Sequence, residues 1–358
     1  MKIAIVGAGL IGKERIEAVR RIAAATNGAV VLDCVYEADP ERCRQIAAKY
    51  DVATVESLSE MYKRTPDWVI ICTPHDVAPR LAIEALKNGV HILVEKPLGR
   101  NIQECDEILA HRRPTQKLHV GFNYRFFAGV EAAIKDAREV RFGELISVNM
   151  ILGHGNAPGM ENSWKLDPVR CGGGCLIDPG IHMLDLVLQL AKELPEVCGG
   201  RHWLGFWNTG IEEEVHLLLA DAAGCVFNVQ ISLNRWRSTF RLELNGTDGY
   251  GVVEGRGRSY GPQSYRTGRR RGWQGGLSQA ASEVVEIAAD KGEDSFLKET
   301  AVMLGERIAK VLFPAMPSTP ACDAGAGRMA MELLERCRQA IFKGVDDAQS
   351  GCLYATLL

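Results

Sequence analysis

Short apolar runs rich in Val, Ile and Leu alternate with longer stretches through the first third of the chain. Such runs are typical of strands buried on both faces of a parallel sheet. The stretches between them repeat apolar residues at helical spacing, which predicts helices. The expected strands are 2–6, 30–36, 68–72, 91–94 and 118–120. This alternation predicts a doubly wound, parallel α/β sheet.

From residue 123 onward the alternation stops. A helix near 128–139, a strand at 144–152 and a long loop at 154–170 are expected first. Five strand-like runs separated by turn signals follow, near 197–207, 213–220, 225–233, 238–244 and 250–254. They predict an open, largely antiparallel sheet. We expect the last helices to cover its inner face, at about 278–290, 296–312 and 324–342.

At 358 residues the chain is long enough for two domains. We expect the parallel sheet in residues 1–122 and an α+β domain in residues 123–358. Besides Asp178, described below, three residues are expected to be helix N-caps, namely Asp39, Asn101 and Asp323.

Residues 7–12 read Gly-Ala-Gly-Leu-Ile-Gly, directly after the first strand and before a helix. In this setting Gly7 permits the tight turn, Gly9 lets a pyrophosphate approach the backbone, and Gly12 allows close helix–strand packing. The helix begins at Leu10 and Ile11, so its unpaired N–H groups would face the phosphates. The motif predicts a Rossmann domain that binds a dinucleotide.

Glu37 ends the second strand, where an acidic residue can bind both ribose hydroxyls of the adenosine half. It would repel the extra phosphate of NADP, so NAD is favoured. NADP stays the alternative because Arg42 lies nearby. Ligands bind such sheets at the carboxyl ends of the strands. The other residues expected at the cofactor for this reason are Thr73, Pro74, His75, Glu95, Lys96 and Asn123.

A run of three glycines at 172–174 precedes an apolar helix and indicates that the chain runs close to something there, such as a ligand. Asp178 is expected to cap this helix, with Pro179 at its first position. His182 lies four residues after Asp178, so the two share one face and can act together in proton transfer. The alternative is a capped helix with a core histidine. Lys96 is either a surface ion-pair partner of Glu95 or a donor to a substrate oxygen.

These motifs occur in the order and spacing of a known family. The chain resembles the oxidoreductases named for glucose–fructose oxidoreductase and inositol dehydrogenase, the Gfo/Idh/MocA family, over nearly its whole length. The segments that carry the resemblance are GAGLIG at 7–12, Thr73-Pro74, VEKPL at 94–98, GFNYRF at 121–126 and GGGCLIDPGIHMLDL at 172–186. One departure follows Thr73-Pro74, where many members carry a histidine and this chain has Ala78, with His75 earlier.

The resemblance implies an NAD(P)-dependent dehydrogenase or ketoreductase that acts on a sugar, a cyclitol or a sugar derivative. It implies that His182 is the general base toward a hydroxyl, that Asp178 and Lys96 position the substrate, and that hydride passes to the nicotinamide. Two other functions fit the same fold. One is glycoside cleavage or epimerisation with no net redox change. The other is a non-catalytic NAD-sensing regulator, which has no need of the proton-transfer residues.

The substrate is expected to contact Arg125, Trp164 and Lys165 besides the catalytic residues, since aromatic faces and fixed cations suit a polyhydroxylated ring. A surface loop anchored by one tryptophan is the alternative for residues 154–170. Residues 256–271 hold six arginines. They form a solvated loop, contact a neighbouring subunit, or bind an anionic substrate such as a sugar phosphate or a nucleotide-sugar.

The net charge of −3 gives no general attraction to nucleic acid or to an anionic membrane. No apolar run approaches a membrane span, and the chain opens on a strand rather than a signal peptide. Eleven cysteines without a CxxC pair indicate reduced thiols rather than a disulfide framework or a metal site. We therefore expect a cytoplasmic protein. The resemblance implies a homodimer or homotetramer paired through the broad face of the second sheet.

Overall fold

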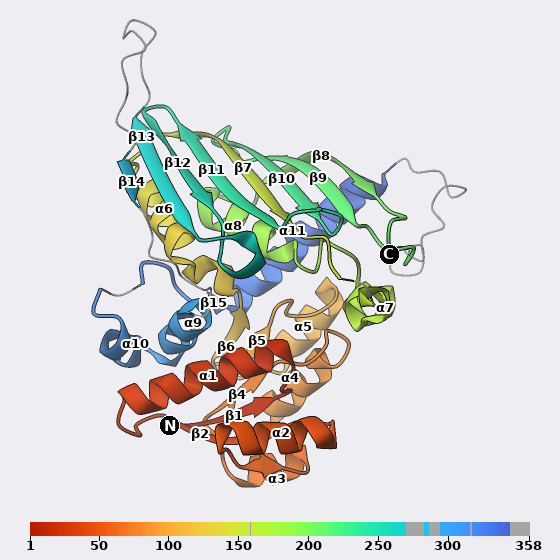
Figure 1. The fold of residues 1–358 in the computed structure, drawn as a ribbon, viewed down its shortest axis with the longest axis vertical. Coiled ribbons are helices and arrows are strands. Elements are labelled where there is room, and N and C mark those ends of the chain that lie inside the picture. The colour runs from red at the N-terminus through yellow and green to blue at the C-terminus, as the bar shows by residue number, and fades with distance from the viewer. Residues whose placement is uncertain (158, 270–282, 286–293, 316, 344–358) are drawn as a thin grey trace, which may run out of the picture. The chain divides into compact units, whose positions relative to one another are not determined.

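The computed structural model describes residues 1–157, 159–269, 283–285, 294–315 and 317–343 (Figure 1). The chain forms two compact units. Unit 1 is built from Met1–Phe126 and Glu293–Met331, and unit 2 from Phe127–Gly292 and Glu332–Leu358. The expected division into 1–122 and 123–358 differs from this arrangement, because a late segment of the chain folds with the first sheet.

The sheet of unit 1 has the strand order β15-β6-β5-β4-β1-β2-β3. Its strands are β1 (Lys2–Val6), β2 (Val31–Tyr36), β3 (Thr54–Val55), β4 (Trp68–Ile71), β5 (His91–Glu95), β6 (Leu118–Gly121) and β15 (Cys322–Asp323). The first six pair in parallel, and β15 pairs antiparallel with β6 at one edge. The predicted doubly wound parallel sheet is confirmed. The pattern missed β3 and β15, because two residues are too few to show a period.

The helices of unit 1 are α1 (Leu10–Ala25), α2 (Pro40–Tyr50), α3 (Leu58–Lys63), α4 (Ala78–Lys87), α5 (Ile102–Ala110), α9 (Asp294–Leu304) and α10 (Glu306–Leu312), with the 3-10 turn η1 at Asn123–Phe126. Residues of α9 and α10, such as Phe296 and Ala309, share a core with Ile16 and Val19 of α1. The expectation that these two helices cover the second sheet is therefore wrong. The predicted single helix at 296–312 is interrupted at Gly305, whose φ of +125° is one that side chains rarely adopt.

Three of the four expected N-caps are confirmed, and the fourth, Asp178, is not. Asp39 accepts from the N–H groups of Glu41 and Arg42, with Pro40 at the first helical position. Asn101 accepts from the N–H of Glu104. Asp323 accepts from the N–H of Ala326 at the start of α11 (Ala324–Phe342).

The sheet of unit 2 has the order β14-β13-β12-β11-β7-β10-β9-β8. Its strands are β7 (Leu145–Gly153), β8 (Glu196–Trp203), β9 (Glu214–Ala220), β10 (Val226–Ser232), β11 (Thr239–Gly246), β12 (Gly249–Glu254), β13 (Ser264–Arg269) and β14 (Glu283–Val285). Only β7 and β10 pair in parallel among these described strands. The predicted open, largely antiparallel sheet is confirmed.

Two strands of unit 2 lie where the sequence predicted other structures. In β13 the buried residues Tyr265 and Thr267 alternate with less buried neighbours, a strand pattern that the surrounding arginines concealed. The predicted helix at 278–290 is wrong at its described residues, since 283–285 form β14. The rest of that prediction lies outside the described residues.

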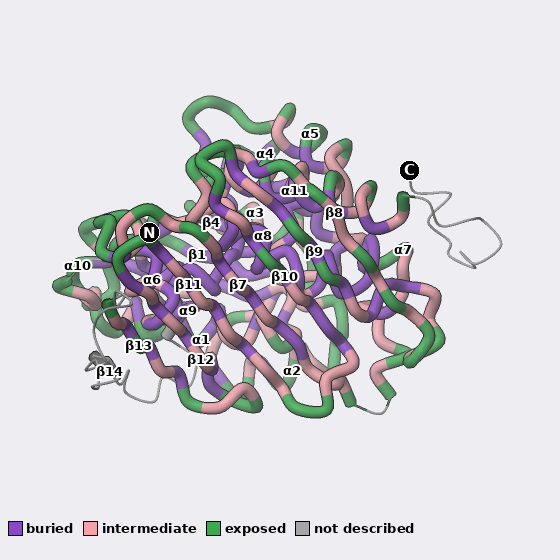
Figure 2. The backbone as a smooth tube through the Cα atoms, turned by 90° about the horizontal axis from the view of Figure 1, so that it is seen from above, coloured by how far each residue is buried: buried purple, intermediate pink, exposed green. Residues whose placement is uncertain are grey.

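Helices α6 (Ala128–Arg138) and α8 (Ile181–Leu190) lie against one face of this sheet (Figure 1), and the end of α11 reaches the same sheet at β8. Buried and less buried positions alternate along β9 and most of β10 (Figure 2), so the less buried side chains lie on the opposite face of the sheet. Between β7 and α8 the chain forms short turns: η2 (Met160–Asn162), η3 (Trp164–Leu166) and α7 (Pro168–Cys171). Among the described residues, no helix combines the length and apolar character that crossing a bilayer requires.

Candidate functional site

The glycine loop after β1 has the geometry that a dinucleotide needs. Gly7 has φ +89°, and a Cβ there would lie 2.7 Å from the carbonyl oxygen of Cys72. A Cβ at Gly12 would collide with the carbonyl of Gly7, whereas one at Gly9 would meet nothing within 4 Å. No side chain caps the start of α1 at Leu10. The loop therefore leaves the unpaired N–H groups of the first turn, at Leu10 and Ile11, open to a phosphate.

Glu37 lies beside this loop. One carboxylate oxygen accepts from the N–H of Ala8 at 2.7 Å, and the other from the N–H of Asp39 at 3.0 Å. Arg42 donates to the second oxygen from 3.3 Å, and its side chain is 42% exposed against 7% for Glu37. The carboxylate is therefore held against the glycine loop, and Arg42 offsets part of its charge.

Thr73 closes the same loop from the end of β4. Its methyl group would lie 3.0 Å from a Cβ at Gly7, and its hydroxyl is buried without a hydrogen-bond partner among the described residues. Such an orphan hydroxyl beside an open helix end suits a bound ligand. His75 is buried, and the carbonyl of Pro74 accepts from the N–H of Ala78, which begins α4. These residues fit a dinucleotide.

Two further predicted site residues contact the late segment of unit 1. The amide of Asn123 donates to the hydroxyl of Ser295 at 3.0 Å. Arg125 is buried and donates to the carbonyl oxygen of Pro320 at 3.3 Å. Both side chains tie η1 to this segment, a role the sequence did not indicate.

Glu95 belongs to a buried ionic cluster. Nε of Arg15 donates to Glu95 at 2.6 Å, and another nitrogen of the same guanidinium donates to Glu299 of α9. Burial alone would lower the pKa of Arg15, but Glu95 and Glu299 reverse this and raise it. Arg15 and Glu299 were missed, because a polar residue inside a helical pattern is normally assigned to the solvent face.

In unit 2 the predicted cap of α8 is wrong. The helix begins at Ile181 with Gly180 as N-cap and no side-chain cap. The Asp178 side chain, 8% exposed, instead pairs with Nζ of Lys165 at 2.9 Å. His182, 4% exposed, lies in the first turn of α8. The structure thus joins a predicted substrate residue directly to a predicted catalytic one.

The pKa of Lys165 is raised by the Asp178 charge, although burial opposes this shift. The lysine is therefore charged at neutral pH and forms an ion pair with Asp178. Nζ of Lys165 lies 5.8 Å from the centre of the Trp164 ring. The two predicted substrate residues of this loop are thus neighbours.

His154 is a site residue that the sequence analysis missed. Its N–H donates to the carbonyl of Ser232, and its ring packs edge-on against Tyr260 of η4 (Arg258–Tyr260). Burial lowers the pKa of His154, Asp178 raises it, and Lys165 and Arg256 lower it further. His154 is therefore within electrostatic reach of the Lys165–Asp178 pair. It directly follows β7, so applying the strand-end rule to the second sheet would have found it.

The arginine-rich segment divides among several environments. The Arg256 guanidinium lies 3.7 Å from the centre of the Tyr260 ring. Arg266 pairs with Glu254 on the neighbouring strand at 2.8 Å, and Arg258 is exposed. Arg270 and Arg271 lie outside the described residues. Among the described arginines of this segment, Arg256 is thus the one whose charge lowers the pKa of His154.

Glu212 explains the glycine run before α8. Its buried carboxylate accepts from the N–H of Gly174 at 3.0 Å and of Leu176 at 3.2 Å. The Cys175 N–H donates to the Glu212 carbonyl, and a Cβ at Gly174 would collide with that carbonyl. The close approach expected at these glycines is therefore to Glu212. It was missed because three consecutive glutamates at 212–214 resemble a solvated face.

Two family models match the chain. The model described as "Oxidoreductase family, NAD-binding Rossmann fold" covers residues 1–122, and "GFO/IDH/MocA C-terminal domain" covers residues 131–251. The chain belongs to the GFO/IDH/MocA oxidoreductase family. The resemblance inferred from the motifs is confirmed, and the matched N-terminal domain is an NAD-binding one, as predicted.

Several curated proteins are similar to the chain. A 2,7-anhydro-N-acetylneuraminate hydratase of Escherichia coli is 32% identical over 46% of this chain and 44% of its own length. A levoglucosan dehydrogenase of Pseudarthrobacter phenanthrenivorans is 27% identical over 60% of this chain and 63% of its own. An inositol 2-dehydrogenase of Rhizobium meliloti is 29% identical over 69% of this chain and 74% of its own length. The chain thus spans less than two thirds of the first two relatives.

Among solved structures, a levoglucosan dehydrogenase in complex with NADH and levoglucosan superposes with a TM-score of 0.80. It is 19% identical and covers 96% of this chain and 97% of its own. An aldose-aldose oxidoreductase of Caulobacter crescentus complexed with glycerol superposes with a TM-score of 0.76. It is 19% identical over 96% of this chain and 98% of its own. At this identity the likeness supports the two-domain fold.

We expect Gly174→Ala to destabilise unit 2 by about 2 kcal/mol or more, because the new methyl group would displace the Glu212 backbone. Urea unfolding measures this change. Gly199→Ala is the matched control, since a Cβ at Gly199 meets nothing within 4 Å. Equal stability of the two variants would contradict the role given to Glu212.

Proposed function

We propose that the protein is an NAD-dependent dehydrogenase or ketoreductase acting on a sugar, a cyclitol or a sugar derivative. The observation that carries this proposal is the pairing of Lys165 with the buried carboxylate of Asp178, four residues before the buried His182, in a chain whose family is an NAD-binding oxidoreductase family. Relatives named for levoglucosan and inositol support a polyhydroxylated substrate.

In the proposed reaction, bound NAD supplies the hydride acceptor, and the protein handles the proton. His182 takes the proton of the substrate hydroxyl as the carbon loses its hydride, which leaves a ketone. Asp178, paired with Lys165, stabilises the charged imidazole. Lys96 donates a hydrogen bond to the reacting oxygen and stabilises its developing negative charge. Trp164 and Lys165 are proposed to contact the ring of the substrate.

A reaction without net redox change is the second candidate function. It is favoured by the relative named as a hydratase, whose name describes no redox change. Steady-state release of NADH separates the two candidates, because only the dehydrogenase accumulates it. The non-catalytic regulator is disfavoured, since Lys96, Asp178 and His182 are all present.

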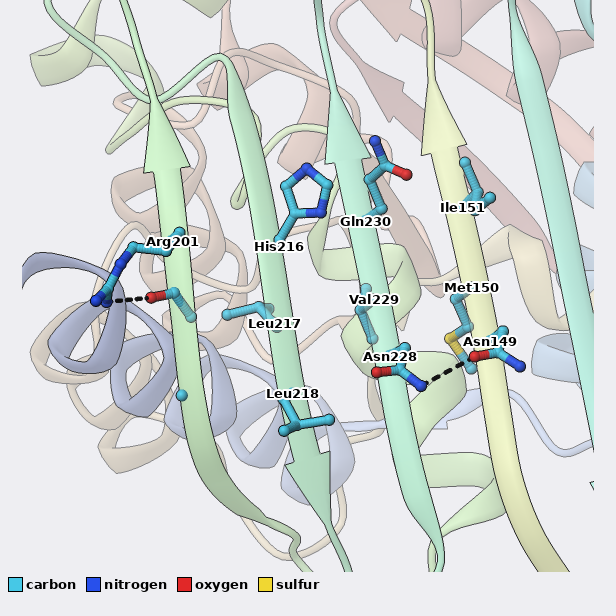
Figure 3. A pocket seen from close by; sticks show the side chains of 12 residues that line it. Asn149, Met150, Ile151, Arg201, His216, Leu217, Leu218, Asn228, Val229 and Gln230 are labelled. Carbon is cyan, nitrogen blue, oxygen red and sulfur yellow. Dashed lines mark hydrogen bonds between the residues drawn. The ribbon is translucent and has the colours of Figure 1, made fainter.

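We further propose that the protein pairs with itself through the open face of the unit 2 sheet. This face carries a hollow lined from β7, β8, β9 and β10, shown in Figure 3. Leu218 is exposed on it, and Asn228 donates to Asn149 across neighbouring strands. A mixed polar and apolar face of this kind supports a homodimer or homotetramer.

The ten cysteines of the described chain are free thiols, which supports a cytoplasmic location.

The proposal includes an anionic group on the substrate, a phosphate or a nucleotide diphosphate. Arg256 and Lys165 both act on His154, whereas Asp178 is the one carboxylate among the charges acting there. This local excess of positive charge supports an anion. Arginine also matches phosphate oxygens with two parallel donors.

We expect Lys96→Ala and His182→Ala each to lower kcat roughly a hundredfold or more while NAD still binds, because the first removes the donor to the reacting oxygen and the second removes the proposed base. Stopped-flow rates and NAD titration measure the two effects. His111→Ala is the control, as this histidine lies at the end of α5 and its ring donates a hydrogen bond to the carbonyl of Glu107 in the same helix. A near-normal kcat in His182→Ala would exclude it as the base.

NAD should bind more tightly than NADP, and Glu37→Ala should weaken NAD by about tenfold while NADP improves, because Arg42 is then released toward the phosphate. Calorimetry with both cofactors measures the preference. Glu41→Ala serves as control, since this exposed glutamate pairs only with its own helix neighbours among the described residues. Tighter NADP binding by the wild type would reverse the assignment.

Once an anionic substrate turns over, Arg256→Gln should raise its KM about tenfold or more and leave KM for neutral sugars nearly unchanged. The KM for the anionic substrate should also rise with salt, because partly exposed charges are screened. Arg266→Gln is the control from the same segment, as Arg266 pairs with Glu254. Equal changes in the two variants would favour a neutral substrate.

A further inference from the structure

Three charged side chains from distant parts of the sequence meet inside unit 1. Arg15 of α1 is fully buried, Glu95 ends β5, and Glu299 lies on α9. The same guanidinium also donates to the hydroxyl of Thr300 at 3.0 Å and lies 4.9 Å from the centre of the Phe296 ring. One cation therefore serves two carboxylates and anchors α9 to the parallel sheet.

The sheet is shaped to receive the Glu95 carboxylate. Glu95 pairs in register with Gly121 of β6. A Cβ at Gly121 would lie 2.6 Å from a Glu95 carboxylate oxygen, so only glycine leaves room for it. On its other side the carboxylate accepts from Nε of Arg15 at 2.6 Å. The end of β5 is thus held by its ladder and by one buried ion pair.

Lys96 is the next residue. Consecutive Cα atoms across a trans peptide are about 3.8 Å apart, so whatever fixes Glu95 also restricts the backbone of Lys96. We propose that Arg15 and Glu299 are positioning residues for Lys96, acting through Glu95, and that the hold on Lys96 tightens when Glu299 takes up a proton. The role of Lys96 in the reaction rests on the proposed function, whereas the positioning of Lys96 by Arg15 and Glu299 does not.

The protonation step follows from the charges around Glu299. One of its oxygens faces Arg15, and the other is buried without a hydrogen-bond partner among the described residues. Burial raises the pKa of Glu299 to about 7, with Arg15 lowering it, Glu95 raising it and Arg125 lowering it. The thiol of Cys72, at the end of β4, is the remaining titratable group whose charge is felt by Arg15, and burial keeps it protonated.

The direction of the effect can be worked out. Below about pH 7 Glu299 is neutral and does not repel Glu95, so Arg15 holds the Glu95 carboxylate with no opposing charge. Above that pH the guanidinium is shared by two carboxylates, and the end of β5 is held less firmly. Because the pKa of Glu299 in the fold exceeds that of an exposed glutamate, ionising it also costs stability as the pH rises toward 7.

Hydrogen exchange on the full chain, read on the peptide spanning 92–100 at pH 6 and pH 8 and corrected for intrinsic rates, tests the proposal. The wild type should show protection of the Glu95 and Lys96 amides several-fold higher at pH 6. Glu299→Gln should show the pH 6 level at both values. Arg15→Lys, which keeps the charge and loses the fork, should lower protection roughly tenfold at both. Arg20→Lys, on the same helix and half exposed, should change nothing.

The proposal is overturned if Glu299→Gln keeps the pH dependence of the wild type, or if Arg15→Lys behaves like Arg20→Lys. Should Glu299→Gln not fold, Arg15→Lys alone decides, because its loss of protection at 92–100 is required. Where a substrate is turned over, Arg15→Lys should lower kcat about tenfold with little change in KM. Altered exchange without any hydride transfer would refute the proposed function and leave the positioning intact.

Discussion

The guanidinium of Arg15 is the contact on which the organisation of unit 1 depends. It joins the helix that follows the dinucleotide loop, the strand that ends before Lys96, and a helix that enters from the last sixth of the chain. A buried charge of this kind is tolerated only with partners on every side. The same contact that keeps α9 in this unit therefore also fixes the end of β5.

Unit 2 uses a buried carboxylate in a comparable way. The Glu212 carboxylate accepts from N–H groups of the chain before α8. Position 174 is a glycine because the carbonyl oxygen of Glu212 lies where a side chain would be. Asp178 and His182 are thus carried on a segment whose backbone is tied down one turn earlier. The Lys165–Asp178 pair then sets the charge at the start of α8, with His154 and Arg256 in electrostatic reach. The proton transfer proposed for these residues requires such fixed placement.

Features that depend on residues close together in the sequence were predicted, whereas features whose contacts join distant parts of the chain were missed. Gly7, Glu37 and Thr73 were predicted because each follows an apolar run. A residue in that position lies at the carboxyl edge of a parallel sheet, where ligands bind. The caps Asp39, Asn101 and Asp323 were also predicted, since a cap and its partners lie within three residues. Asp178 was misassigned as a cap by the same local reasoning, because its partner Lys165 lies outside the helix.

By itself the sequence determined the parallel sheet, the open second sheet, the dinucleotide loop and the family, because these depend on periodicity and on motifs of a few residues. The tertiary structure decided that α9 and α10 pack on α1 and that β15 joins the first sheet. It also decided that Arg15 and Glu212 are buried and that His154 lies in electrostatic reach of Asp178 and Lys165. The physical reason is that a charged residue in a helix or a loop looks alike in sequence whether it faces water or an opposite charge. Only the fold brings residues such as Arg15 and Glu299, far apart in the chain, to one point.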